Sequence, residues 1–306
     1  MALTRGNFAS LIEPGLRKYF SEEFDGFPSM LKSFYSFLPH RGLPYQKFAG
    51  IIDLPVASEF TGTVEYMDTY ENSATQLEYK EYAPGIQIQW KLIQDAMHFS
   101  IENKARGLAK SIAERRERDG ARRLNYANAT TDDEGTSTSI YDGGALCANA
   151  HSSIVPNSTL SQDNLYTLEV SHDNVITNRE LMRKYKSDNG ILAGIMPDLL
   201  LGHPDKADDF FEITRSQLRS DNADNASNYN KGFRYDVWDH LDLDTDNWFL
   251  IDSKRMKRAM VWIDRVAPKF FKMRDFDTFV AKYSAYTRYT YGVVGDWRWI
   301  SMSVPA

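Results

Sequence analysis

The chain has 306 residues, of which 42% are hydrophobic and 25% are charged, and its formal net charge at pH 7 is −6. This is the composition of an ordinary soluble folded protein, and the length allows one large domain or two to three smaller ones. The negative charge excludes a global basic field that would hold nucleic acid. The single cysteine, Cys147, excludes intramolecular disulfides and argues against cysteine-ligated zinc.

The first ten residues, MALTRGNFAS, lack the apolar core of a signal peptide. No run of about 18 apolar residues, the length that crosses a bilayer, occurs in the sequence. We therefore expect synthesis and folding in a cytosol-like compartment, without a membrane partner.

Residues 1–50 lack the pattern of a compact domain. Short helices are expected within residues 7–20, interrupted at Pro14 and Gly15. Aromatic rings then gather in a stretch broken by glycine and proline, and they include Phe24, Phe27 and Phe34. Because little regular structure is predicted around these rings, we expect an arm that lies across another surface, its own or a neighbour's. A helical cap on the core of the same chain is the alternative.

Beyond the arm the pattern changes to the two-residue period of β-strands. Residues 63–70 and 77–82 alternate in this way, and turn-forming residues separate them at 71–75. The pattern predicts a long hairpin whose aromatic residues include Tyr66, Tyr70, Tyr79 and Tyr82. A two-stranded hairpin alone is marginally stable, so this one should lie on another surface. Residues 86–90 predict a short strand that leads into a helix.

Residues 91–129 contain no proline and predict one long helix. Apolar residues recur every three or four positions from Ile93 to Ile112, which places one apolar stripe on one helical face. A fully helical stretch would be about 50 Å long at 1.5 Å per residue. We expect a break or bend near Gly120, since glycine weakens a helix by roughly 1 kcal/mol relative to alanine. The stripe is too short for a coiled coil, so a sheet should pack against this helix.

A basic run follows the apolar stripe, and it consists of Arg115, Arg116, Arg118, Arg122 and Arg123. Glu114, Glu117 and Asp119 are interleaved with it, so we expect pairing along the helix and a solvated, salt-bridged face. Exposed pairs contribute only about 0.2–1 kcal/mol each. Weak contact with phosphate is the alternative, although partly neutralised arginines release few counterions.

The second half of the chain predicts an α/β body and then long strands. Residues 130–165 read as loop with little strand. Helices are expected at 174–185 and 205–219, buried strands at 195–202, 233–238 and 248–252, a mobile polar loop at 220–231 and an acidic turn at 239–246. Further strands are expected at 259–266 and 269–273. In residues 279–291, apolar and aromatic side chains occupy almost every second position, which predicts one long strand. Because its length matches that of the long helix, the strand should pack beside the helix. Asp296 is the expected partner of Arg298.

No catalytic constellation stands out. Asp242, Asp244 and Asp246 have the first spacings of a calcium loop, but Asn247 and Ser253 occupy the positions that require Gly and Glu, so a solvated turn is expected.

The histidines and the cysteine show no site either. His151, His172 and His203 lack the spacing of a helical zinc site, and we expect them in loops or at the surface. Cys147 precedes His151 by four residues without an orienting third group, so a buried apolar thiol is expected. The sequence therefore predicts no enzyme, no cofactor and no metal.

Four further segments occur in a characteristic order. They are TRGNFASLIEPGLRKYF, YDGGALCANAHS after the long helix, DTDNWFLIDS, and the closing FDTFVAKYSAYTRYTYGVVGDWRWISMS. Together they resemble the major capsid proteins of tailed bacteriophages, which have the Hong-Kong-97-type fold, and most closely the branch of the Mu-like major head subunit. Each segment is a weak signal alone, but four in order are fairly specific. Cys147 departs from this pattern, where an aromatic residue is commoner.

The resemblance implies an α+β fold with four parts. They are an N-terminal arm at 1–50, an extended hairpin loop with its lead-in strand at 51–90, a peripheral domain with a long spine helix at 91–129 and 253–291, and an α/β axial domain at 130–252 and 292–306. The implied function is self-assembly through hexamers and pentamers into the icosahedral head shell, the virion capsid, around double-stranded DNA. Portal, scaffolding and cement proteins are implied partners, and packaged DNA would be contacted non-specifically at most.

In this family the arm and the hairpin loop reach neighbouring subunits. The residues that the resemblance places at inter-subunit contacts are Phe24, Phe27, Phe34, Tyr66, Tyr70, Tyr79 and Tyr82. An encapsulin-like shell of a cellular compartment is the first alternative, and the Mu-like motifs argue against it. The second is an enzyme that uses the aspartate turn or Cys147.

Overall fold

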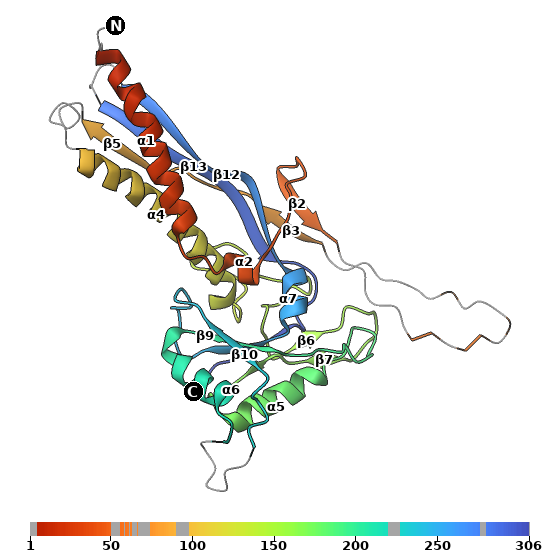
Figure 1. Cartoon of the computed structure of the whole chain (residues 1–306). Coiled ribbons are helices and arrows are strands. Elements are labelled where there is room, and N and C mark those ends of the chain that lie inside the picture. Colours follow the sequence, from red (N-terminus) through yellow and green to blue (C-terminus); the bar gives the residue numbers. More distant parts are fainter. Residues whose placement is uncertain are drawn as a thin grey trace.

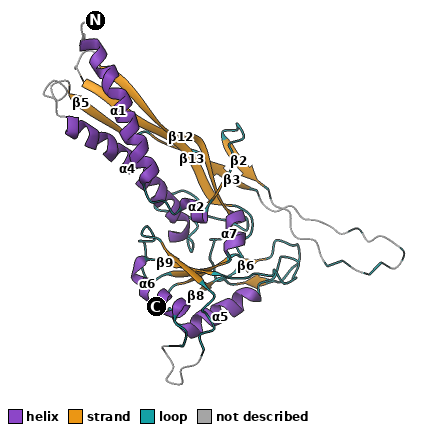
Figure 2. Cartoon of the chain, in the orientation of Figure 1, coloured by secondary structure: helices purple, strands orange, loops and turns teal. Residues whose placement is uncertain are grey.

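The computed structural model describes residues 5–49, 56–57, 59–60, 62, 66, 74–89, 98–219, 227–275 and 280–305. Two five-stranded sheets organise these residues, a long sheet at one end and a compact sheet at the other (Figures 1 and 2). None of the helices within these ranges is long and apolar enough to cross a membrane.

The long sheet is built on β12 (Met260–Asp275) and β13 (Val280–Val293), which pair antiparallel over most of their length. β1 (Ser36–Phe37) joins it beside β12, while β4 (Lys80–Tyr82) and β5 (Gly85–Gln89) both pair with β13. Buried and half-buried residues alternate along β13, which confirms the predicted one-sided strand.

The helix α4 (His98–Asn125) lies along this sheet and confirms the predicted long helix over its described residues (Figure 1). Residues 90–97 lie outside the described ranges, and the helix ends four residues before the predicted limit. Its buried stripe includes Ala105, Leu108 and Ile112, which share one hydrophobic cluster with Tyr283 and Ala285 of β13. The predicted packing of the long helix beside the long strand is therefore confirmed.

The N-terminal helix α1 (Arg5–Gly26) packs against α4 and runs through Pro14 and Gly15. The expected interruption at these two residues is wrong. Proline removes one backbone hydrogen bond, and tertiary packing along a helix can offset that loss. Leu16 and Phe20 of α1 are buried in the cluster beneath α4, so this part of the arm belongs to the core of its own chain.

The helix α4 also continues through Gly120, so the expected break is wrong. A Cβ atom at this position would lie 2.2 Å from Cδ2 of Leu31 and 3.3 Å from the ring of Trp238. Glycine fits this position because Leu31 and Trp238, from two other parts of the chain, approach the helix closely here.

Replacing Gly120 by alanine is expected to lower the free energy of unfolding by about 1–3 kcal/mol, because the buried Leu31 side chain would have to move. Gly107→Ala in the same helix is the control, since no atom lies within 4 Å of its Cβ position. That variant should be neutral or more stable by up to about 1 kcal/mol. Urea unfolding of both variants checks this, and equal effects would contradict it.

The compact sheet has the strand order β10-β9-β11-β14-β8. Its strands are β8 (Leu165–Tyr166), β9 (Leu199–Gly202), β10 (Arg234–Val237), β11 (Trp248–Ile251) and β14 (Ile300–Ser303). Its helices are α5 (His172–Arg183) and α6 (Ala207–Arg215), with a 3₁₀ turn at Pro204–Lys206. These elements confirm the predicted helices and strands, with bounds shifted by a few residues. Residues 220–226 of the expected loop lie outside the described residues. A short pair, β6 (His151–Ser152) and β7 (Ser161–Gln162), lies in the region expected to be loop.

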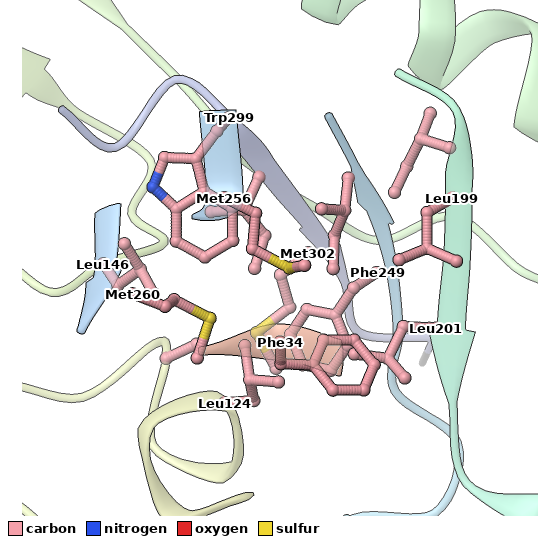
Figure 3. Close-up of a cluster of buried hydrophobic side chains, with 14 of the residues drawn as sticks. Phe34, Leu124, Leu146, Leu199, Leu201, Phe249, Met256, Met260, Trp299 and Met302 are labelled. Atoms are coloured by element: carbon pink, nitrogen blue, oxygen red, sulfur yellow. The ribbon is translucent and has the colours of Figure 1, made fainter. Parts of the chain in front are cut away.

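Both sheets contribute to one hydrophobic cluster (Figure 3). The compact sheet supplies Leu199, Leu201, Phe249 and Met302. Phe34 comes from α2 (Leu31–Phe34), Leu124 from α4, and Met256 from α7 (Ser253–Ala259). The segment before β1 and the end of α4 are therefore buried against the compact sheet and α7.

The second arm of the predicted hairpin pairs within its own chain. β3 (Thr75–Glu78) pairs antiparallel with β2 (Tyr45–Phe48), and β4 pairs with β13. Residues 75–82 of the predicted hairpin therefore lie against strands of their own chain. Of the first arm, only Tyr66 lies within the described residues.

Candidate assembly surfaces

One arginine of the basic run of α4, Arg116, faces the long sheet. Arg116 is 7% exposed, and its guanidinium donates hydrogen bonds of 2.7 and 3.0 Å to the two carboxylate oxygens of Asp264 on β12. It also lies 4.9 Å from the ring centre of Trp262. The expected solvated face is therefore wrong for Arg116, because β12 brings an acid opposite the helix. Pairing along the helix is confirmed for Arg118, which contacts Glu114 at 3.4 Å.

Asp119 is fully buried at the centre of this junction. Its Oδ2 atom accepts hydrogen bonds from the hydroxyls of Tyr82, at 2.9 Å, and Tyr289, at 2.8 Å, while Arg115 lies 3.0 Å from Oδ1. Burial and the Asp119 carboxylate raise the pKa of Tyr82 to about 12, so its hydroxyl keeps its proton and donates it. This one carboxylate ties α4 to β4 and β13.

Glu134, in the loop after α4, binds three cations. Its carboxylate lies 2.9 Å from Nζ of Lys80, 2.5 Å from Arg115 and 2.7 Å from Arg122. Burial opposes the charged form, but the hydrogen bonds from Arg122, Lys80 and Arg115 outweigh it and hold the pKa of Glu134 well below its usual range. Glu134 thereby links β4, through Lys80, to the helix α4, through Arg115 and Arg122.

Glu134→Gln is expected to lower the free energy of unfolding at pH 7, because it removes the acceptor charge from these three cations. A depressed pKa in the folded state stabilises the protein above the unfolded value of about 4.3, and this contribution is lost as pH falls toward the folded pKa. The difference between wild type and variant should therefore shrink below about pH 4. Urea unfolding of dissociated subunits at pH 7 and pH 3.5 measures it. A difference that stays constant between these two pH values would contradict the assignment.

Three of the residues expected at inter-subunit contacts bind or pack against groups of their own chain, and of these Phe34 is buried while Tyr79 and Tyr82 are half-buried. Phe34 is fully buried and stacks on Trp238 with the ring centres 4.9 Å apart. As a correction, Phe34 has no surface to offer another subunit, because this part of the arm caps its own core. The hydroxyl of Tyr79 bonds to His40 at 2.8 Å and to Gln46 at 3.0 Å, while Tyr82 binds Asp119.

Two of the other expected contact residues line a groove, and a third is exposed. Phe24 and Phe27 are half-buried and line a surface groove of about 360 Å³ between the end of α1 and β12. Tyr66 is 91% exposed, and Tyr70 lies outside the described residues. Sequence reasoning missed Phe37, which lines the same groove and is 44% exposed. Its position two residues beyond the buried Tyr35 gave no signal of this exposure.

The YDGGALCANAHS segment is packed against the compact sheet. His151 is 2% exposed, and its ring nitrogens lie 2.6 Å from Oδ2 of Asp142 and 2.9 Å from Oδ1 of Asn164. Its ring stacks on Trp297 with centres 4.0 Å apart. The expected surface or loop position is therefore wrong for His151. Cys147 is buried as predicted, and burial raises the pKa of its thiol.

The two remaining predicted features are the pair of Asp296 with Arg298 and the aspartate turn, and the charged side chains of both bind groups of their own chain. Arg298 donates to Asp296 at 2.7 Å, which confirms the predicted pair, and it also binds Asp188 at 3.1 Å. In the aspartate turn, Asp244 accepts a backbone hydrogen bond from Asp246, whose carboxylate pairs with Lys206.

The fold and surfaces can be compared with known proteins. The family model described as phage capsid protein matches residues 81–301. The chain in the procapsid of bacteriophage JBD30 has a TM-score of 0.54 and 13% identity, covering 99% of this chain and 77% of that one. The chain in the mature capsid of bacteriophage PhiM1 has a TM-score of 0.55 and 11% identity, covering 92% and 88%. The capsid chain of the native GTA particle has a TM-score of 0.55 and 11% identity, covering 92% and 91%. No curated protein matches.

These solved structures show that the fold is the α+β fold of phage capsid subunits, and they do not favour the encapsulin alternative. The phage capsid family and the capsid structures point to a structural role for this chain. The family match covers residues 81–301, more than half of the chain. The chain therefore belongs to the phage capsid protein family and is a major capsid protein, a self-assembling subunit of the head shell.

Proposed function

We propose that this chain forms the hexamers and pentamers of the icosahedral head of a tailed bacteriophage, around double-stranded DNA. The observation that carries the proposal is the family match over residues 81–301, which includes α4 and most of both sheets. The four ordered sequence segments support placement in the Mu-like branch. Synthesis would take place in the cytoplasm of the host.

The two sheets correspond to the two domains that the family resemblance implies. We assign the long sheet with α4 to the peripheral domain and the compact sheet with α5 and α6 to the axial domain. The segment 1–50 would be the arm, although Leu16, Phe34 and Tyr35 fasten it to its own chain. The segment between β2 and β3 would be the extended loop.

Contacts between subunits would then use the side chains that their own chain leaves uncovered. Phe24 and Phe27 line an open groove, and Tyr66 is 91% exposed. Tyr70 stays a predicted contact. Tyr79 and Tyr82 would act differently, as anchors that hold the base of the loop on the long sheet.

Further partners would be a portal, scaffolding proteins and cement proteins. The arginine run of α4 offers little to packaged DNA, because Arg115, Arg116 and Arg122 bind acids of their own chain. Any contact with DNA through this run would therefore be weak and non-specific.

The contents of the particles test the proposal. Particles purified from producing cells, treated with nuclease and then opened, should release protected double-stranded DNA of defined length. Particles that instead hold a cargo protein and no nucleic acid would favour a cellular compartment and contradict a phage head.

A further inference from the structure

A surface pocket of about 280 Å³ lies at the compact-sheet end of the molecule, between α5, the segment that leads into β9 and the loop before β10 (Figure 1). Its lining includes Arg179 and Arg183 of α5, together with Met196, Tyr229 and Phe233. None of these residues belongs to the candidate assembly surfaces described above. Concave surfaces that combine apolar side chains with a few converging polar groups are the usual form of a ligand site.

The two arginines of this pocket have no acceptor in their own chain. They are four residues apart on α5, which places both side chains on the same side of the helix. Neither side chain forms an ion pair or donates a hydrogen bond to any group among the residues that the structure describes. Each guanidinium offers five N–H donors in a planar fork. The pocket therefore presents two positive charges and a set of donors that the described chain leaves unused.

Aromatic rings hold Arg179 in place. Its guanidinium carbon lies 4.3 Å from the ring centre of Tyr229 and 5.8 Å from that of Phe233. Stacking of this kind uses the flat face of the guanidinium and leaves its N–H edges free to donate. The side chain is half-buried, so it has already lost part of its conformational freedom before a ligand arrives. Arg179 is thus preorganised to bind an acceptor.

Tyr229 is presented to solvent by a loop that is fastened on both sides of it. Asn228 is 8% exposed, and its amide donates to two backbone carbonyls at 2.7 and 2.9 Å. Asn230 is fully buried, and its amide donates to a backbone carbonyl of α5 at 3.1 Å. Between these two anchors Tyr229 is 71% exposed. One side of its ring carries Arg179, and its exposed area is available for a second stacking contact.

Asp198 also lines the pocket, but its carboxylate is already bound. Its Oδ1 atom accepts the backbone N–H of Ser253 at 2.8 Å. Its Oδ2 atom accepts from the hydroxyl of Ser253 at 2.7 Å and from the guanidinium of Arg234 at 2.9 Å. Because Arg234 neutralises Asp198, the charge that stays unpaired in the lining is that of Arg179 and Arg183. The pocket therefore favours a ligand group with two negative charges.

We propose that this pocket binds a nucleotide, with its phosphate on Arg179 and Arg183 and its base on the exposed ring of Tyr229. A phosphate monoester carries about two negative charges at neutral pH, and its oxygens match the guanidinium fork. Arginine beside an aromatic ring suits a single nucleotide unit, because every base has a flat face that stacks. Duplex DNA keeps its bases paired, so the ligand is a free nucleotide or a unit of an unpaired strand. The inference does not depend on the proposed function.

Titration calorimetry of dissociated full-length subunits with adenosine 5′-monophosphate tests the proposal. Adenosine and inorganic phosphate, the two parts of this probe, should each bind about tenfold more weakly or worse. Arg179→Gln and Arg183→Gln should each weaken binding of the monophosphate by about tenfold or more. Lys184→Gln is the matched control, since it removes the same charge at an exposed neighbour outside the lining, and it should bind as wild type does. Circular dichroism checks the fold, and the exposed Arg183 keeps the test valid if Arg179→Gln misfolds.

Substitution of Tyr229 separates the base from the phosphate. Tyr229→Ala should lower the affinity for the monophosphate to that for inorganic phosphate, whereas Tyr229→Phe keeps the ring and should bind as wild type does. A single-stranded oligoadenylate identifies the source of the ligand, because it binds more tightly than the monophosphate only if the site takes an unpaired strand, and either result supports the site. No binding of the monophosphate at millimolar concentration, equal binding of monophosphate and inorganic phosphate by wild type, or tighter binding of an aspartate-rich peptide would overturn the proposal.

Discussion

Asp119→Ala is expected to lower the free energy of unfolding of the subunit by about 3–5 kcal/mol, the usual cost of removing one partner from a buried ion pair. The carboxylate is fully buried, and it accepts from Tyr82 and Tyr289 while it faces Arg115 at 3.0 Å. Without it these groups keep their burial but lose their common acceptor. Urea unfolding followed by circular dichroism measures the change from midpoint and slope.

The control for this variant is Glu114→Ala in the same helix. Glu114 pairs with Arg118 at 3.4 Å, and the two side chains are 38% and 60% exposed. Exposed pairs contribute about 0.2–1 kcal/mol, so the control should lose no more than that. An Asp119→Ala variant that is no less stable than the control would show that the junction does not fasten the helix to the sheet.

Phe34→Ala is expected to lower the free energy of unfolding by about 3–5 kcal/mol, as large-to-small replacements of buried phenylalanine do. Its ring is fully buried against Trp238, within the cluster that both sheets share. The matched variant Phe37→Ala removes a ring that is 44% exposed, and its loss should be below about 1 kcal/mol. Thermal and urea unfolding of the two variants would contradict this reasoning if the losses were equal.

The same packing changes what truncation of the arm should do. From the sequence, the arm could be an appendage that is dispensable for folding. Leu16, Phe20 and Phe34, however, are buried in the two hydrophobic clusters of the subunit. Deletion of residues 1–35 should therefore destabilise the subunit itself and not only its assembly.

Elements with one buried face could be predicted from the sequence. The two-residue period of β13 and the three-to-four-residue period of α4 both reflect burial on one side, so the local pattern carries the information. The roles of Gly120 and Arg116 could not be predicted in this way. Gly120 is fixed by Leu31 and Trp238, and Arg116 by Asp264, which are all distant in sequence.

The contact surfaces were only partly predictable for the same reason. Alternation predicted strands at Tyr79 and Tyr82, and Tyr82 lies in β4 whereas Tyr79 lies between β3 and β4. The pattern could not show that the hydroxyl of Tyr79 bonds to Gln46 and that of Tyr82 to Asp119. Phe24 and Phe27 were placed near the surface by a resemblance, since a structural protein has no catalytic constellation to find.

Electron microscopy of the purified wild-type protein tests the assignment as a shell subunit most directly. A major capsid protein should form closed, hollow particles of uniform diameter and icosahedral outline, with this chain as their most abundant component. A folded protein that stays monomeric at every concentration and salt condition, and that is absent from particles of the cells producing it, would contradict the assignment.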